Sequence, residues 1–205
     1  MLALLVVVAG MASMAVEMTA SRLLAPFFGD SLYIWGILIG LILAYLTLGY
    51  WLGGRLADRQ PRRRVFFGLN AAAAIAVALA GLVATPVLTA ALGGTERWPY
   101  GLFLGALGGC LALFAVPVVL LGCVNPFAIR LKVVGLSEAG NVSGTIFALT
   151  TIGSLIGTFA AVFLLIPSWG ARATLYAFAA LLLLVSAAGW LSSGTAPARA
   201  SSQAS

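Results

Sequence analysis

The feature that most constrains this chain is an uncharged, mostly apolar run over residues 32–52, followed at once by five arginines within residues 53–64. A helix of roughly 20 apolar residues covers the ~30 Å hydrocarbon core of a bilayer. Short loops rich in Lys and Arg remain on the cytoplasmic side of a membrane. The pattern therefore predicts a membrane-spanning helix that leads into a cytoplasmic loop.

The rest of the chain repeats the apolar pattern. It is 62% hydrophobic and 8% charged, whereas soluble domains carry about 25% charged residues. We therefore predict an all-α, polytopic membrane helix bundle with six transmembrane helices in one domain, residues 1–191, and a disordered cytoplasmic tail, residues 192–205. The expected spans are residues 2–25, 32–52, 65–84, 98–131, 145–166 and 171–191.

Basic residues set the expected orientation. With both termini in the cytoplasm, one side holds eight basic residues, which are Arg55, Arg59, Arg62, Arg63, Arg64, Arg130, Lys132 and Arg199. The other side holds three, which are Arg22, Arg97 and Arg172. The bias favours a multi-pass protein of the cytoplasmic membrane with both termini inside.

The composition argues against two other classes of function. A net charge of +6 is found in nucleic-acid-binding proteins, but here the basic residues flank apolar spans, where they set topology and contact anionic lipid. The partner we expect is the lipid bilayer and not nucleic acid. The chain has no His and no evident nucleophile–base pair, so we expect no enzyme activity, cofactor or metal.

Helix packing and one helix break can also be predicted. Glycines recur four residues apart, as in Gly49/Gly53 and Gly153/Gly157. Such spacing lets helices approach closely, either within one bundle or across a dimer. The span over residues 98–131 would be about 51 Å long, which exceeds the membrane. Pro117 or the Asn125–Pro126 pair should kink or end it.

Few residues could form a binding site inside the spans. Glu17 is the only acid well within one, and a charge there needs a cavity or a partner. It could bind a cation, or it could form a structural pair with Arg22 or Arg172. Asn125 precedes a proline, so nearby carbonyls could coordinate a ligand, or the helix could simply kink. The candidate substrate-binding residues are Glu17, Arg22, Asn125, Thr150, Thr151 and Ser154.

The loop after the second span carries a family pattern. It reads Gly54-Arg-Leu-Ala-Asp58-Arg59-Gln-Pro-Arg62-Arg63. This resembles the signature between helices two and three of the major facilitator superfamily, with Pro61 where that family usually has Gly. The resemblance implies half of a twelve-helix transporter, in which Gly54, Asp58, Arg59, Arg62 and Arg63 belong to a cytoplasmic gate.

A closer resemblance rests on three blocks. They are residues 17–29 with 49–59, residues 125–130, and residues 144–157 with 166–172. Together these resemble the membrane domain of the fused major-facilitator/spermidine-synthase-like proteins. Their soluble aminopropyltransferase domain has no counterpart in this sequence. The resemblance therefore implies a membrane architecture and a link to polyamine chemistry, and it implies no catalysis.

Three functions are compatible with these features. The chain could be a transporter-like module that moves polyamines or other small organic cations as a homodimer. It could instead anchor a separately encoded, soluble aminopropyltransferase-like partner, or it could be a structural subunit of a larger complex. Of these three functions, we favour the transporter slightly over the anchor.

Overall fold

The computed structural model describes residues 1–93, 100–133 and 135–193, and these residues form helices joined by short connections, with no β-strand among them. The predicted all-helical fold is confirmed. The elements are α1 (Leu2–Phe28), α2 (Leu32–Arg59), α3 (Arg63–Gly93), α4 (Gly101–Gly122), α5 (Val124–Lys132), the short 3-10 turn η1 (Leu136–Glu138), α6 (Ala139–Phe159), the π-helical turn η2 (Ala160–Leu165) and α7 (Ile166–Ser192).

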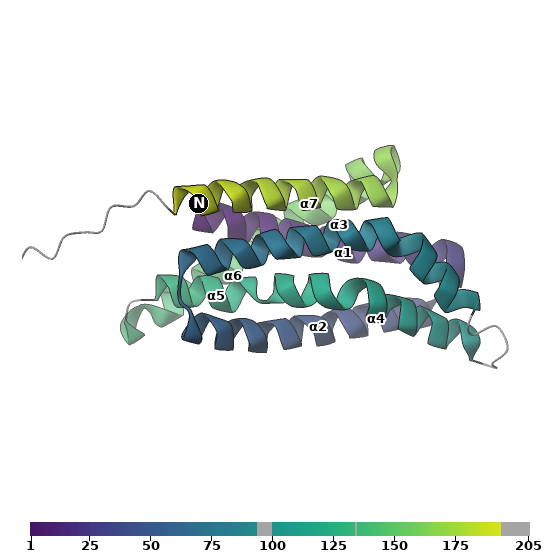
Figure 1. Cartoon of the computed structure of the whole chain (residues 1–205), viewed down its shortest axis with the longest axis horizontal. Coiled ribbons are helices and arrows are strands. Elements are labelled where there is room, and N and C mark those ends of the chain that lie inside the picture. Colours follow the sequence, from purple (N-terminus) through teal and green to yellow (C-terminus); the bar gives the residue numbers. More distant parts are fainter. Residues whose placement is uncertain (94–99, 134, 194–205) are drawn as a thin grey trace, which may run out of the picture.

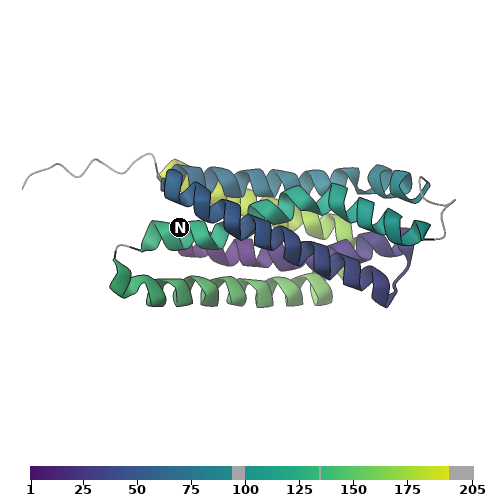
Figure 2. The same cartoon turned by 90° about the horizontal axis from the view of Figure 1, so that it is seen from below.

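The helices run roughly along the long axis of the molecule, and α7 ends beside the start of α1 (Figures 1 and 2). Packing contacts join α2 to α4, α4 to α3, α3 to α7, α7 to α1 and α1 to α6. The short helix α5 lies against both α2 and α6. Buried Leu, Val, Ala and Phe side chains fill the space between the helices and form one continuous apolar core.

Five helical segments among the described residues are long and apolar enough to cross a membrane, not the six predicted. The difference lies in the last segment, Ala139–Ser192, which has 54 residues. The chain reverses within it at Gly170, where φ is 82° and ψ is 168°, so α6 and α7 run in opposite directions (Figure 1). Long apolar helices in this number are those of a multi-pass membrane protein.

Several predicted boundaries were wrong because helices extend further than the proline and arginine patterns suggested. Residues 53–64 are not a loop: α2 continues to Arg59, and the linker is residues 60–62. Likewise α3 continues past Pro86 to Gly93. A proline removes a single backbone N–H donor, and packed membrane helices can accommodate that loss. Of the predicted tail, Ser192 is the last residue of α7, and residues 194–205 lie outside the described residues.

The helix break predicted in the long fourth span is present. Helix α4 passes through Pro117 without ending, and it stops at Gly122. Cys123 separates it from α5, which carries Asn125 and Pro126 in its first turn. Because Pro126 has no N–H group, it cannot donate to the carbonyl of Gly122, and one helical hydrogen bond is missing here. The interruption is local, since Cys123 keeps helical φ and ψ angles of −65° and −17°.

Two helix crossings depend on glycine. Where α2 crosses α4, a Cβ added to Gly49 would lie 2.9 Å from the Cα of Gly122, and one on Gly53 would lie 2.8 Å from the Cβ of Cys123. Where α1 crosses α6, a Cβ on Gly157 would lie 2.6 Å from the Cα of Met11. The predicted close approach at these glycine pairs is therefore confirmed, and it occurs within one bundle. By contrast, Gly36, Gly40, Gly140 and Gly144 face open space.

The two crossings share one register. Gly49 and Gly53 meet Val119 and Cys123, while Gly153 and Gly157 meet Val7 and Met11. The glycines of the second crossing lie 104 residues after those of the first, and their partners lie 112 residues earlier. The reciprocal contacts obey the same offsets, because Gly122 meets the carbonyl of Leu46 and Gly10 meets that of Thr150. The α2–α4 and α1–α6 pairs are thus equivalent, as they would be in a bundle built from two related three-helix halves.

Candidate functional site

A polar cavity lies between α1, α2, the α4–α5 break and α6. Its volume is about 100 Å³, which is room for several waters, since one water needs about 10–15 Å³ measured in this way. The polar side chains that line it are Ser13, Tyr50, Asn125, Thr150 and Ser154. A cavity with these walls can bind a small polar group by hydrogen bonding.

The best-defined contact in the cavity joins two helices that are distant in sequence. The Thr150 hydroxyl on α6 lies 2.6 Å from Oδ1 of Asn125 on α5 and 3.0 Å from its own helix's carbonyl at Ile146. A hydroxyl has one proton and can donate to only one acceptor at a time. When it donates to Ile146, the amide oxygen of Asn125 can accept a hydrogen bond from a bound group.

The helix break places Asn125 at this position. Because α4 ends at Gly122 and α5 begins at Val124, the side chain of Asn125 emerges from the first turn of a new helix. It is 8% exposed, and it faces α6. The interruption is thus next to the cavity, which Val124 and Asn125 line from the first turn of α5.

The cavity also lies where the equivalent helix pairs meet. The offsets that relate the two crossings pair Ala9 with Leu121, Ser13 with Asn125, Leu46 with Thr150 and Tyr50 with Ser154. All of these residues line the cavity. The site is therefore built from both three-helix halves, at the interface between them.

The remaining substrate-binding candidates are less closely grouped. Ser154 donates a hydrogen bond to the Gly10 carbonyl at 3.3 Å and lines the cavity. Thr151 is exposed and bonds its own helix at Phe147, so it points elsewhere. Arg22 is exposed in the last turns of α1. The structure brings together Asn125, Thr150 and Ser154, and it does not bring Thr151 or Arg22 to them.

Glu17 lies near the cavity without lining it. It follows Ser13 by four residues on α1, which places it about 6 Å further along the helix and on nearly the same face. Its side chain is half-buried and forms no hydrogen bond or ion pair with a described residue. The expected structural pair with Arg22 or Arg172 is not formed among these residues.

Two residues of the cavity were missed by the sequence reasoning. Ser13 is one of three hydroxyl residues in the first apolar span, with Thr19 and Ser21, and nothing in its neighbours distinguishes it. Tyr50 lies near the end of the apolar run over residues 32–52, where an aromatic residue is common at a membrane interface, yet it also lines the cavity. The equivalence of the helix pairs could have indicated both, because Ser13 and Tyr50 correspond to the candidates Asn125 and Ser154.

The basic end of the bundle, where α2, α5 and α7 end and α3 begins, holds the family pattern. Asp58 pairs with Arg130 of α5 at 3.0 Å and not with the neighbouring Arg59. Gly54 lies against Pro126, because a Cβ added to Gly54 would lie 4.0 Å from the Cβ of Pro126. Two of the blocks that carry the family resemblance thus contact one another here.

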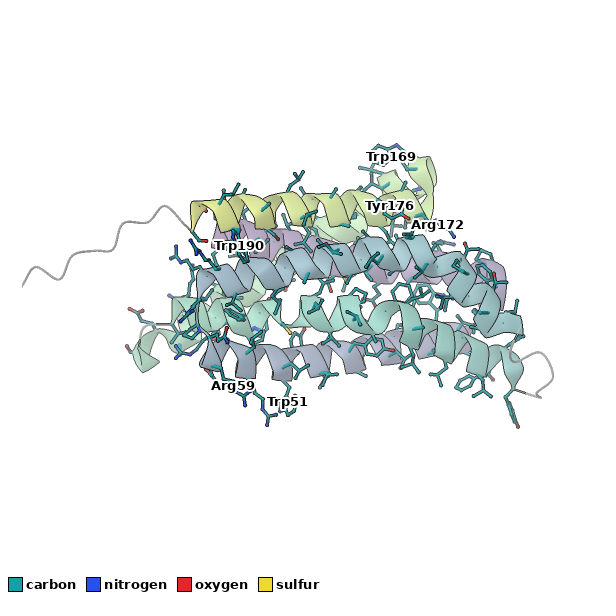
Figure 3. All side chains as sticks on the ribbon, viewed as in Figure 1. Trp51, Arg59, Trp169, Arg172, Tyr176 and Trp190 are labelled. Carbon is teal, nitrogen blue, oxygen red and sulfur yellow. The ribbon has the colours of Figure 1, made fainter. Side chains whose placement is uncertain are left out.

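Charge is distributed unevenly between the two ends. Among the described residues, the basic end carries Arg55, Arg59, Arg62, Arg63, Arg64, Arg130 and Lys132 with two acids, Asp58 and Glu138. The far end carries Arg22, Arg172 and Asp30. Figure 3 shows Arg59 near the basic end and Arg172 with Trp169 at the other. Arg55 stacks over the ring of Trp51, 3.6 Å from its centroid, which is a geometry suited to the membrane interface.

Comparisons with known proteins add no further constraint. No protein-family model matches the chain, and neither a curated protein nor a solved structure matches it significantly.

Proposed function

We propose that the chain is a six-span, transporter-like membrane module that binds a small polar or cationic organic group in the cavity beside Asn125 and Thr150. The observation that carries this proposal is the Asn125–Thr150 contact at a helix break, inside a cavity with hydroxyl-lined walls. Transporters commonly place substrate sites at broken helices between internal repeats. The equivalent α2–α4 and α1–α6 crossings support an internal repeat of this kind.

The size and charge of the site favour one class of ligand. About 100 Å³ accommodates an amine- or amide-sized group and not a whole polyamine. The cavity supplies hydrogen-bond acceptors, and the carboxylate of Glu17 lies one helical turn away. The amino end of a small organic cation therefore fits best, and a longer cation would extend past Glu17. This agrees with the polyamine link implied by the resemblance to the major-facilitator/spermidine-synthase-like proteins.

The proposal includes an orientation and an assembly. The basic end faces the cytoplasm, because it holds the excess of Arg and Lys. Both termini of the chain lie on that same side. Helix α6 presents exposed apolar residues along much of its length. In a twelve-helix transporter the second half covers such a face, so here a second copy would cover it in a homodimer.

Binding is tested with purified protein in lipid nanodiscs. Putrescine and the neutral probe acetamide are titrated while the thermal midpoint is recorded. Thr150→Val should weaken putrescine binding about tenfold, and the adjacent Thr151→Val should leave it unchanged because Thr151 points away. Glu17→Gln should weaken putrescine binding and leave acetamide binding unchanged. Equal effects of the two threonine variants would contradict the site.

Transport is tested separately by uptake of labelled putrescine into proteoliposomes.

The second candidate function is a membrane anchor. The positively charged basic end favours it, because this end could dock a soluble acidic enzyme. An anchor would show no uptake and no effect of Thr150→Val. It would instead retain a soluble aminopropyltransferase-like enzyme on the membrane in a salt-dependent manner.

A further inference from the structure

A second cavity lies at the basic end, away from the Asn125 site. It is formed where α1 and α3 begin and where α5 and α7 end, and its volume is about 310 Å³. Arg63 and Lys132 line it together with Ser193, and Leu2 and Phe67 form apolar parts of its wall. None of the proposed functions described above uses this cavity.

The charge in this cavity is unbalanced. Arg63 and Lys132 come from different helices, and neither forms an ion pair with a described residue. None of the described residues that line the cavity is acidic. Two helices begin here and two end here, so their dipoles largely oppose each other and the side-chain charges dominate. Two cations that share a partly enclosed space attract an anion.

The walls indicate what kind of anion fits. Leu2, which is partly exposed, provides apolar surface beside the cations, and the buried Phe67 closes the wall behind it. A free inorganic ion does not need such a surface. The cavity lies at the end of the apolar helices, so a bilayer that surrounds these helices would place it near the lipid head groups. Basic pockets between membrane helices on the cytoplasmic side suit phosphate-bearing head groups. Arg is well matched to phosphate because its guanidinium can donate two parallel hydrogen bonds.

We infer that this cavity binds the phosphodiester head group of an anionic phospholipid, with Arg63 and Lys132 on the phosphate and the first acyl carbons along Leu2. The site requires a membrane location for the chain, and it is independent of whether the module transports or anchors.

Native mass spectrometry of the purified protein measures the site directly. The protein is exchanged into detergent with mixed phosphatidylglycerol and phosphatidylcholine, and retained lipid is counted. We expect one phosphatidylglycerol to be retained. The double variant Arg63→Gln/Lys132→Gln should lose at least nine-tenths of it. The control Arg55→Gln/Arg64→Gln removes the same charge at the same end but lies outside the cavity, and it should keep the lipid.

Three outcomes would overturn the inference. Equal loss in both double variants would mean that general surface charge attracts the lipid. Retention of phosphatidylcholine to the same extent would mean that the phosphate charge is not recognised. If inorganic phosphate alone raised the thermal midpoint as much as phosphatidylglycerol does, the ligand would be a soluble anion. Lys132→Arg keeps the charge and should retain the lipid, which separates loss of binding from loss of folding.

Discussion

Replacing Gly49 with alanine tests the helix crossing between α2 and α4. The added Cβ would lie 2.9 Å from the Cα of Gly122 and 3.2 Å from its carbonyl carbon, and it would also meet the carbonyl oxygen of Val119. Carbon atoms in good contact are about 3.5–4.0 Å apart. The neighbouring atoms all belong to the backbone, so the two helices must separate by roughly 0.5–1 Å.

The size of the effect follows from two opposing terms. Overpacking a well-packed interior destabilises by about 1–3 kcal/mol, and rigid backbone neighbours favour the upper part of that range. Alanine in place of glycine within a helix stabilises by about 1 kcal/mol. The matched control is Gly40→Ala on the same helix, where no atom lies within 4 Å of the added Cβ. Gly40→Ala therefore measures only the stabilisation that alanine gives to the helix.

We expect Gly49→Ala to be less stable than Gly40→Ala by about 2–3 kcal/mol. For a chain of this size that is a difference of roughly 5–10 °C in thermal midpoint. Circular dichroism during heating in one detergent measures it, and the folded far-ultraviolet spectra of both variants serve as a check. Midpoints within about 1 °C of each other would refute the reasoning, because they would mean that Gly49 does not face α4.

Three further predictions follow from the packing and the charge distribution. Gly153→Ala should destabilise as much as Gly49→Ala, to within about 1 kcal/mol in the same heating experiment, because the two crossings share a register. The Asp58–Arg130 pair is exposed, so a double-mutant cycle with Asp58→Asn and Arg130→Gln should give a coupling free energy of about 0–1 kcal/mol. This coupling should decrease with added salt, and a larger value would indicate a buried pair. A cysteine at Gln60 should react with an impermeant reagent only from the cytoplasmic side, and reaction from outside would reverse the orientation.

The fold was largely predictable because apolar length is a direct signal in a membrane chain. The run before the arginines became α2, and the proline after Asn125 marked a real helix break. Helix ends were less predictable. Arginines and a proline indicate where a helix leaves the apolar layer, but the hydrogen-bonded helix can continue beyond it, as α2 does to Arg59.

The site was only partly predictable. Polar residues in apolar spans are rare enough to be noticed singly, which is how Asn125, Thr150 and Ser154 were found. Whether they meet depends on the register between helices that are far apart in sequence, and composition does not contain that information. Thr151 illustrates the limit, since one residue along α6 rotates the side chain by about 100° and away from the cavity.

The reversal at Gly170 has a mechanical consequence. Between the end of α6 and the body of α7, the π-helical turn and residues 166–169 are all helical, and Gly170 is the one non-helical residue. The two helices are therefore joined at the far end without a flexible loop. A tilt of α6, which carries Thr150, must therefore pull the beginning of α7, and α7 packs against α3. A covalent cross-link between α3 and α7, placed well away from Asn125, would therefore restrain the width of the cavity.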